Sequence, residues 1–126
     1  MGFWSRRNWM TLAAVGGFLA VAFGAFAAHG VSDPKARELL RTGSLYAFIH
    51  CLATFAAAGA VQAGATRARF APAFFLSGVL LFSGSLYALA LSAPGWVGVV
   101  TPIGGLCFLV GWAVLAWSAR ELDSRP

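Results

Sequence analysis

Charged residues divide the chain into three long uncharged stretches, and the lengths of these stretches predict its organisation. Residues 8–32 and 42–66 form two stretches of 25 residues, and residues 70–119 form one of 50. A bilayer core of about 30 Å needs about 20 apolar residues for each crossing helix. The first two stretches therefore predict one span each. The third predicts two, because Ser92-Ala93-Pro94-Gly95 interrupts it near its middle.

This pattern predicts an all-α membrane protein in which four transmembrane helices form an up-down bundle. We expect spans near residues 9–28, 44–62, 73–91 and 99–118, within one domain of residues 1–126. The first connection should contain a short helix in the headgroup layer, because Asp33 can cap a helix that begins with Pro34.

The composition favours a membrane protein and argues against a nucleic-acid-binding one. Hydrophobic residues make up 60% of the chain and charged residues 10%, whereas a soluble domain is about 25% charged. The net charge of +5 forms no basic patch, because the nine Lys and Arg residues are scattered over tails and loops. Cys51 and Cys107 fall inside predicted spans, where a cysteine usually acts as a small apolar filler. We therefore expect a lipid bilayer as the surroundings, no nucleic acid and no disulfide framework.

The distribution of Lys and Arg predicts the orientation in the membrane. One side of the predicted topology carries six basic residues and the other carries three. The six are Arg6, Arg7, Arg67, Arg69, Arg120 and Arg125, and the three are Lys35, Arg37 and Arg41. Because the more basic side normally faces the cytoplasm, we expect both termini to be cytoplasmic.

The first apolar segment has two interpretations. Arg6-Arg7, an apolar run and Ala25-Phe26-Ala27 imitate a cleavable secretory signal, but the run of about 20 residues exceeds the 7–15 of a signal core. Small residues that would let two helices pack closely in lipid also recur every four positions, at Gly16, Ala20, Gly24 and Ala28. We therefore expect a retained first helix that packs through this stripe. Gly104 and Gly105, which follow Pro102, are expected to allow either a kink or a second close helix crossing.

Four segments of the sequence together resemble one family. They are residues 22–30, residues 42–46 with His50, residues 81–91, and residues 101–105 with residues 108–113. In this order they closely resemble the YgdD/YwdK-like family of small bacterial inner-membrane proteins, over nearly the whole chain. The resemblance implies a retained first helix, four spans and a bacterial inner membrane, with Ala27 in place of an expected glycine. It implies no activity, because the family has no established biochemical function.

Polar side chains are concentrated in the outer halves of the predicted spans. Tyr46, His50 and Thr54 are four residues apart and share one helix face. An ionisable residue within a span suggests a function, so we expect His29 to reach the Tyr46 and His50 face of the second span. The structural alternative is that His50 only bonds a neighbouring helix and that His29 is a hydrated helix end. Tyr46 and Tyr87 would then be ordinary aromatic residues of the membrane interface. The candidate polar cluster is His29, Tyr46, His50, Thr54, Ser85, Tyr87 and Thr101.

These features favour a non-catalytic membrane protein over an enzyme. The sequence has no Ser-His-Asp set, metal-binding motif or phosphate-binding loop. The first hypothesis is an accessory or scaffold protein, or one that binds a lipid-like ligand between its helices, as a homo-oligomer or within a larger membrane complex. The second is a haem- or quinone-binding protein that uses His29 and His50. The third is a small transporter, which is weaker because every Asp and Glu lies outside the predicted spans.

Overall fold

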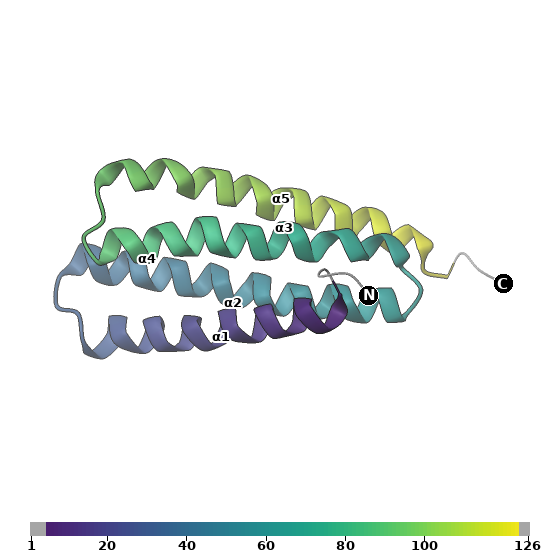
Figure 1. Ribbon diagram of the computed structural model, residues 1–126, viewed down its shortest axis with the longest axis horizontal. Helices are drawn as coiled ribbons and strands as arrows, with labels where there is room; N and C mark the ends of the chain where they lie inside the picture. The colour runs from purple at the N-terminus through teal and green to yellow at the C-terminus, as the bar shows by residue number, and fades with distance from the viewer. Residues whose placement is uncertain (1–4, 124–126) are drawn as a thin grey trace.

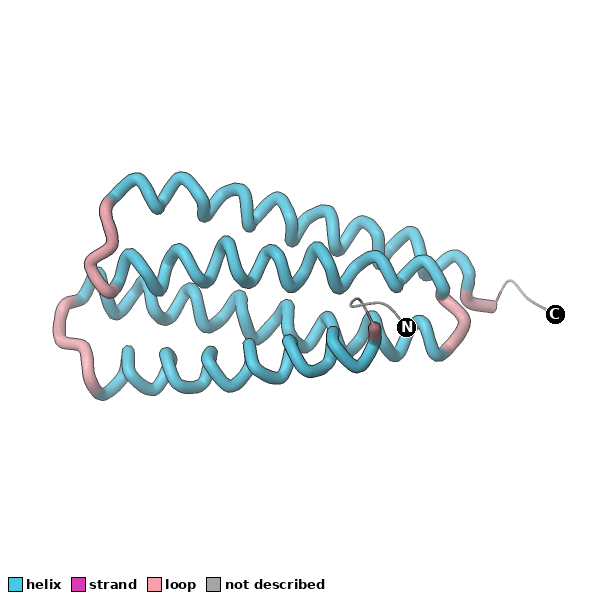
Figure 2. The backbone as a smooth tube through the Cα atoms, in the orientation of Figure 1, coloured by secondary structure: helices cyan, strands magenta, loops and turns pink. Residues whose placement is uncertain are grey.

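The described part of the chain contains four long helices, which run side by side along the length of the molecule (Figure 1). The computed structural model describes residues 5–123, and no strand occurs within that range. Arg125, which contributes to the predicted charge asymmetry, lies outside the described residues. Short loops join successive helices at alternate ends of the bundle, as Figure 2 shows. The predicted up-down arrangement of four helices is therefore confirmed.

The two first helices are continuous, whereas the third and fourth are built from several segments. Helix α1 is Arg6–His29 and α2 is Pro34–Gln62. The third consists of the 3-10 turn η1 at Thr66–Phe70, α3 at Ala71–Gly78, the π-helical segment η2 at Val79–Ser83 and α4 at Gly84–Ala90. The fourth consists of the 3-10 turn η3 at Gly95–Val99, α5 at Val100–Ser118 and the 3-10 turn η4 at Ala119–Glu121. Each of the four is long and apolar enough to cross a membrane.

The helix predicted in the first connection is present, but it is the beginning of α2 and not a separate element. Asp33 caps α2 through its side chain, which accepts a hydrogen bond from the Ala36 backbone N–H at 2.9 Å, and Pro34 occupies the first turn as predicted. Gly43 is the weakest helix former between this segment and the predicted span. A single glycine costs a helix only about 1 kcal/mol, and Tyr87 packs directly against this one. The helix therefore continues through it.

Helices α1 and α5 lie on opposite sides of a central pair formed by α2 and the α3–α4 helix (Figure 1). Helix α1 packs mainly on α2, and α5 packs mainly on α3 and η2. Contacts between α1 and α3 are few. The seam between α1 and the α3–α4 helix is therefore loosely packed, and the stacked rings of Phe23 and Tyr87 are among its few direct contacts.

Small residues of α1 face α2, which is the packing that their spacing predicts. A Cβ on Gly16 would lie 2.6 Å from the Cys51 Sγ, and one on Gly24 would lie 3.7 Å from the Ser44 Oγ. Ala20 is fully buried between these two glycines. The predicted stripe departs from the structure at its end, where Ala27 is buried and Ala28 is exposed. Four residues turn an α-helix by about 400°, so a strict four-residue spacing drifts about 40° per step away from the contact.

A second close contact joins α5 to η2. A Cβ on Gly104 would lie 2.4 Å from the Phe82 backbone nitrogen, whereas one on Gly105 would have no atom within 4 Å. The prediction that Gly104 lies in a helix crossing matches this contact. Gly105 lies outside it, because neighbouring residues on a helix point about 100° apart.

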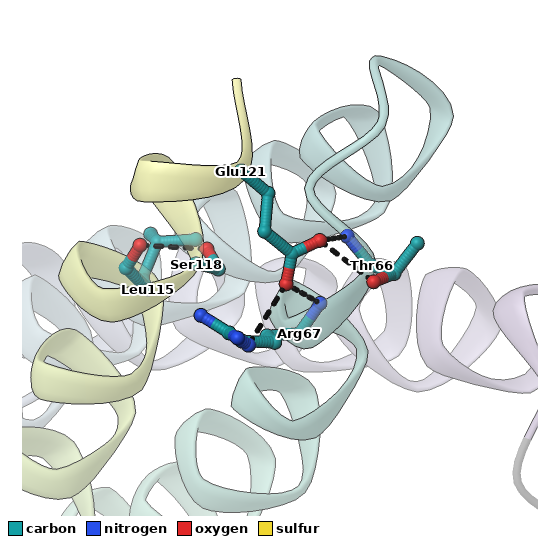
Figure 3. A network of polar contacts seen from close by, with 5 residues as sticks. All are labelled: Thr66, Arg67, Leu115, Ser118 and Glu121. Carbon is teal, nitrogen blue, oxygen red and sulfur yellow. Dashed lines mark hydrogen bonds and ion pairs between the residues drawn. The ribbon is translucent and has the colours of Figure 1, made fainter. Parts of the chain in front are cut away.

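Glu121 links two segments at the end of the bundle where α1 begins and the fourth helix ends, called the terminal end below (Figure 3). Its carboxylate accepts hydrogen bonds from the Thr66 backbone N–H at 2.6 Å, the Thr66 hydroxyl at 2.7 Å and the Arg67 backbone N–H at 3.1 Å. The Arg67 guanidinium completes the group with an ion pair at 3.1 Å. The connection between α2 and α3 is thus tied to the end of the fourth helix.

Candidate functional site

His50 lies at the centre of a contact among three helices. Its Nδ1 lies 2.7 Å from the Tyr46 carbonyl oxygen, and its Nε2 accepts a hydrogen bond from the Trp112 indole N–H at 3.0 Å. Indole can only donate, so Nε2 must carry the lone pair and Nδ1 must carry the proton. The arrangement therefore requires a neutral imidazole with both nitrogens engaged.

Aromatic rings surround this imidazole. The Phe108 ring is stacked on it, with centroids 3.5 Å apart and an interplanar angle of 7°, and the Phe75 ring lies 5.7 Å away. The Tyr46 ring, one turn before His50 on α2, is parallel to the imidazole, and the two ring centroids lie 6.1 Å apart. Thr54 continues the same face and donates its hydroxyl proton to the His50 carbonyl oxygen at 2.9 Å. The predicted Tyr46, His50 and Thr54 face is thus a packing surface toward α3 and α5.

His29 does not join this face, which corrects the expectation that it reaches Tyr46 and His50. The contacts of Gly16 with Cys51 and of Gly24 with Ser44 set the register of the antiparallel pair. In that register His29 is level with residue 39 of α2, and His50 lies about 16 Å further along the helix axis at 1.5 Å per residue. The His29 side chain is exposed at the end of α1. The two imidazoles therefore cannot share one haem or quinone.

The remaining polar residues of the candidate cluster pair with other polar groups between helices. The Tyr87 and Ser44 hydroxyls lie 3.0 Å apart, and the Ser85 and Thr101 hydroxyls lie 2.5 Å apart. Ser83, at the end of η2, donates to the Gly43 carbonyl oxygen at 2.6 Å. In hydrocarbon an unpaired polar group is costly, so these pairs stabilise the bundle. They leave few polar groups in this region free to hold a ligand.

An apolar groove of about 380 Å³ follows the seam between α1 and the α3–α4 helix, above the surface of α2. We call it the seam groove. Its walls are mainly aliphatic and aromatic, and they include Leu12, Val15 and Leu19 from α1, Cys51 from α2, Leu80 from η2 and Tyr87 from α4. The volume falls within the range of about 300–1,000 Å³ that is typical of small-molecule pockets. Its chemistry suits a hydrocarbon chain.

The π-helical segment η2 forms part of one wall of the seam groove. Val79, Leu80 and Ser83 of this segment all line the cavity. A π-helical turn is less stable than the α-helix around it and is frequently found at functional sites. Gly104 of α5 lies close to the backbone of Phe82, which belongs to the same π-helical segment.

Sequence reasoning missed two features of this region, the role of Trp112 and the seam groove. Trp112 lies in the middle of the fourth span and not near a membrane interface, where tryptophan is common. That depth was a signal, since an indole N–H inside a bilayer needs an acceptor. The groove had no signal in the sequence, because its lining has the same apolar composition as every lipid-facing surface of the chain.

Comparison with known proteins finds similarity along most of the chain. The profile described as "Protein of unknown function (DUF423)" matches residues 23–105. A UPF0382 membrane protein of Haemophilus influenzae is 44% identical over an alignment of 122 positions that covers 94% of this chain and 98% of that protein. The UPF0382 inner membrane protein YgdD of Escherichia coli K12 is 42% identical over 96% of this chain and 95% of its own length. The UPF0382 membrane protein YwdK of Bacillus subtilis is 33% identical over 90% of this chain and 96% of its own length. No solved structure matches the chain.

Proposed function

Since the chain belongs to the DUF423 family, together with the UPF0382 membrane proteins, we propose its function from the geometry alone, because this family has no known function. The proposed function is that of a non-catalytic membrane protein that holds a lipid-like ligand in the seam groove. The observation that carries this proposal is the groove itself, an apolar cavity of about 380 Å³ bounded by three helices. Where bulk lipid does not fill a groove between helices, the residues that line the groove lose van der Waals contacts. An apolar chain in the groove restores those contacts and bridges α1 to the α3–α4 helix, where direct contacts are few.

The alternative functions have less support. Haem or quinone binding through two imidazoles requires His29 and His50 to meet, and the register of α1 and α2 keeps them apart. Proton-coupled transport requires a group that gains and loses a proton within the membrane. Both nitrogens of His50 are already engaged, by Tyr46 and Trp112. That the protein acts as an accessory or scaffold protein, and that it forms a homo-oligomer or joins a larger membrane complex, stay predictions.

A groove-filling substitution tests the proposal. Gly84 lines the seam groove, and a Cβ at this position would have no atom within 4 Å. Gly84→Leu should therefore place its side chain in the groove without disturbing the backbone. We expect it to reduce the fraction of protein that carries a co-purified lipid by about tenfold, which corresponds to about 1.4 kcal/mol of binding free energy. Native mass spectrometry of protein purified in a mild detergent measures this fraction.

Gly105→Leu is the matched control. Gly105 also has no atom within 4 Å of a Cβ, but it lies on α5 and not in the seam groove. It should retain lipid like the natural protein, and both variants should unfold at similar temperatures. Equal lipid retention in Gly84→Leu and Gly105→Leu would refute ligand binding in the groove.

We also propose that the terminal end of the bundle faces the cytoplasm of a bacterial inner membrane. Basic residues at this end include Arg6, Arg7, Arg67, Arg69 and Arg120, and such an excess is typical of the cytoplasmic side. A C-terminal fusion to green fluorescent protein should therefore fluoresce, and the same fusion to alkaline phosphatase should be inactive. The reverse pattern, with both fusion proteins at full length, would place the termini outside.

A further inference from the structure

A second cavity lies on the same seam, at the terminal end of the bundle. It measures about 720 Å³ and lies between the start of α1, the end of α2 and the start of the third helix. We call it the arginine pocket, because Arg6 and Arg69 line it from opposite sides. Gln62, Val61, Phe70 and Phe74 also contribute to its walls. The pocket therefore combines two cationic groups with an apolar floor.

Neither arginine is neutralised by an acidic residue within residues 5–123. Arg6 donates a hydrogen bond to the Gln62 side-chain oxygen, which carries no charge. The Arg69 guanidinium lies over the Phe70 ring, 4.7 Å from its centroid. The ion pair at this end of the described chain joins Glu121 to Arg67 instead. Two positive charges thus border one pocket, and both side chains are exposed.

Guanidinium groups bind phosphate oxygens through paired, charge-assisted hydrogen bonds. Basic pockets between transmembrane helices on the cytoplasmic side are typical binding sites for anionic lipid headgroups. An isolated inorganic phosphate would use the two arginines but would leave the walls formed by Phe70, Phe74 and Val61 without a partner. A phosphate that carries a glycerol and acyl chains satisfies both parts of the pocket.

The arginine pocket and the seam groove follow one another in register along the seam. On α1 the pocket is lined by Arg6 and Trp9. The groove begins one turn later and is lined by Leu12, Val15 and Leu19. On the third helix the lining passes in the same way from residues 69–74 to residues 76–87. From residue 6 to residue 16 a helix rises about 15 Å, and one leaflet of the hydrocarbon core is also about 15 Å thick. A lipid anchored at the pocket therefore has a chain of the length needed to reach the groove.

We propose that the arginine pocket binds the phosphate headgroup of an anionic phospholipid, whose acyl chain enters the seam groove. This inference rests on the proposed function, because the groove must accept a chain. It adds the class of the ligand, the residues that select it and the direction in which it enters. An anionic lipid from the leaflet at the terminal end is the ligand, and a lipid without net charge binds more weakly.

A comparison of the binding of two lipids with identical acyl chains tests the inference. The purified protein is titrated with phosphatidylglycerol or phosphatidylcholine in mild detergent, and the bound fraction is read by native mass spectrometry. We expect about a tenfold preference for phosphatidylglycerol. Arg6→Gln combined with Arg69→Gln should remove this preference while leaving the binding of phosphatidylcholine unchanged. Arg7→Gln combined with Arg120→Gln removes the same charge from the same end outside the pocket, and should keep the preference.

The outcomes separate this inference from the proposed function on which it rests. A preference that survives Arg6→Gln and Arg69→Gln, or one that is lost equally in the Arg7→Gln and Arg120→Gln control, would overturn the arginine pocket. If Gly84→Leu still reduced both lipids in that case, the seam groove would stand. Displacement of phosphatidylglycerol by an equal concentration of inorganic phosphate would show a free-anion site and overturn lipid binding in the pocket. Failure of the natural protein to bind either lipid would overturn both proposals.

Discussion

Gly104→Ala should lower the free energy of unfolding by about 1–3 kcal/mol, the usual cost of overpacking a close contact. The new Cβ would lie 2.4 Å from the Phe82 backbone nitrogen and 2.8 Å from its Cα. Backbone atoms cannot rotate away as the end of a side chain can, so α5 and η2 must separate. Gly104→Leu should prevent the native packing of α5 altogether. Thermal unfolding in detergent, followed by circular dichroism and size-exclusion chromatography, measures both effects.

The neighbouring glycine supplies the control for this prediction. Gly105→Ala places a methyl group where no atom lies within 4 Å, and alanine is about 0.5–1 kcal/mol better than glycine inside a helix. It should therefore leave the unfolding temperature unchanged or raise it. Equal destabilisation by the two substitutions would show that α5 does not cross η2 at Gly104.

His50→Ala should destabilise the bundle by about 2–3 kcal/mol, because it removes a buried ring and leaves the Trp112 N–H without its acceptor. His50 is 4% exposed and stacked on Phe108. Trp112→Phe should cost less, because it keeps an aromatic ring in place. The double mutant His50→Ala with Trp112→Phe should lose less than the sum of the two single losses. The expected difference is about 0.6–1.7 kcal/mol, from the average to the maximum coupling energy measured for hydrogen bonds between membrane helices.

Two residues that do not contact each other, His50 and Trp96, provide the control for this double-mutant cycle. Trp96 lies on η3 at the far end of the bundle and is 70% exposed. The effects of His50→Ala and Trp96→Phe should therefore add. Additive behaviour of His50 with Trp112 as well would mean that their hydrogen bond contributes nothing to stability. His50 would then need a different explanation for its burial.

The candidate site could be predicted in part, and the two histidines show where prediction stopped. A spacing of four places Tyr46, His50 and Thr54 on one face, as the structure has them. The direction of that face was not predictable, because small residues also allow a close neighbour on the Gly43, Ala47 and Cys51 side of α2. The structure turns the Gly43 side toward α1 and α4, and the His50 side toward α3 and α5. His29 and His50 are separated as a result.

The sequence by itself determined the number of long helices, the positions of their breaks and the cap of α2. These features depend on local chemistry: the length of each apolar run compared with a bilayer, the turn at residues 91–94, and the capping of backbone N–H groups by Asp33. The family followed from the same local patterns, since its motifs lie within single helices and their ends.

Only the tertiary structure decided which face of each helix is buried. In a soluble protein the apolar face of a helix marks the core. In a bilayer the outside of the helix is apolar too, so hydrophobicity no longer separates inside from outside, and van der Waals fit and hydrogen bonding choose the contact. For that reason Gly104 and not Gly105 meets η2, Ala27 and not Ala28 is buried, and His50 pairs with Trp112. The loosely packed seam between α1 and α3 has the same origin, because few side chains fit together across it.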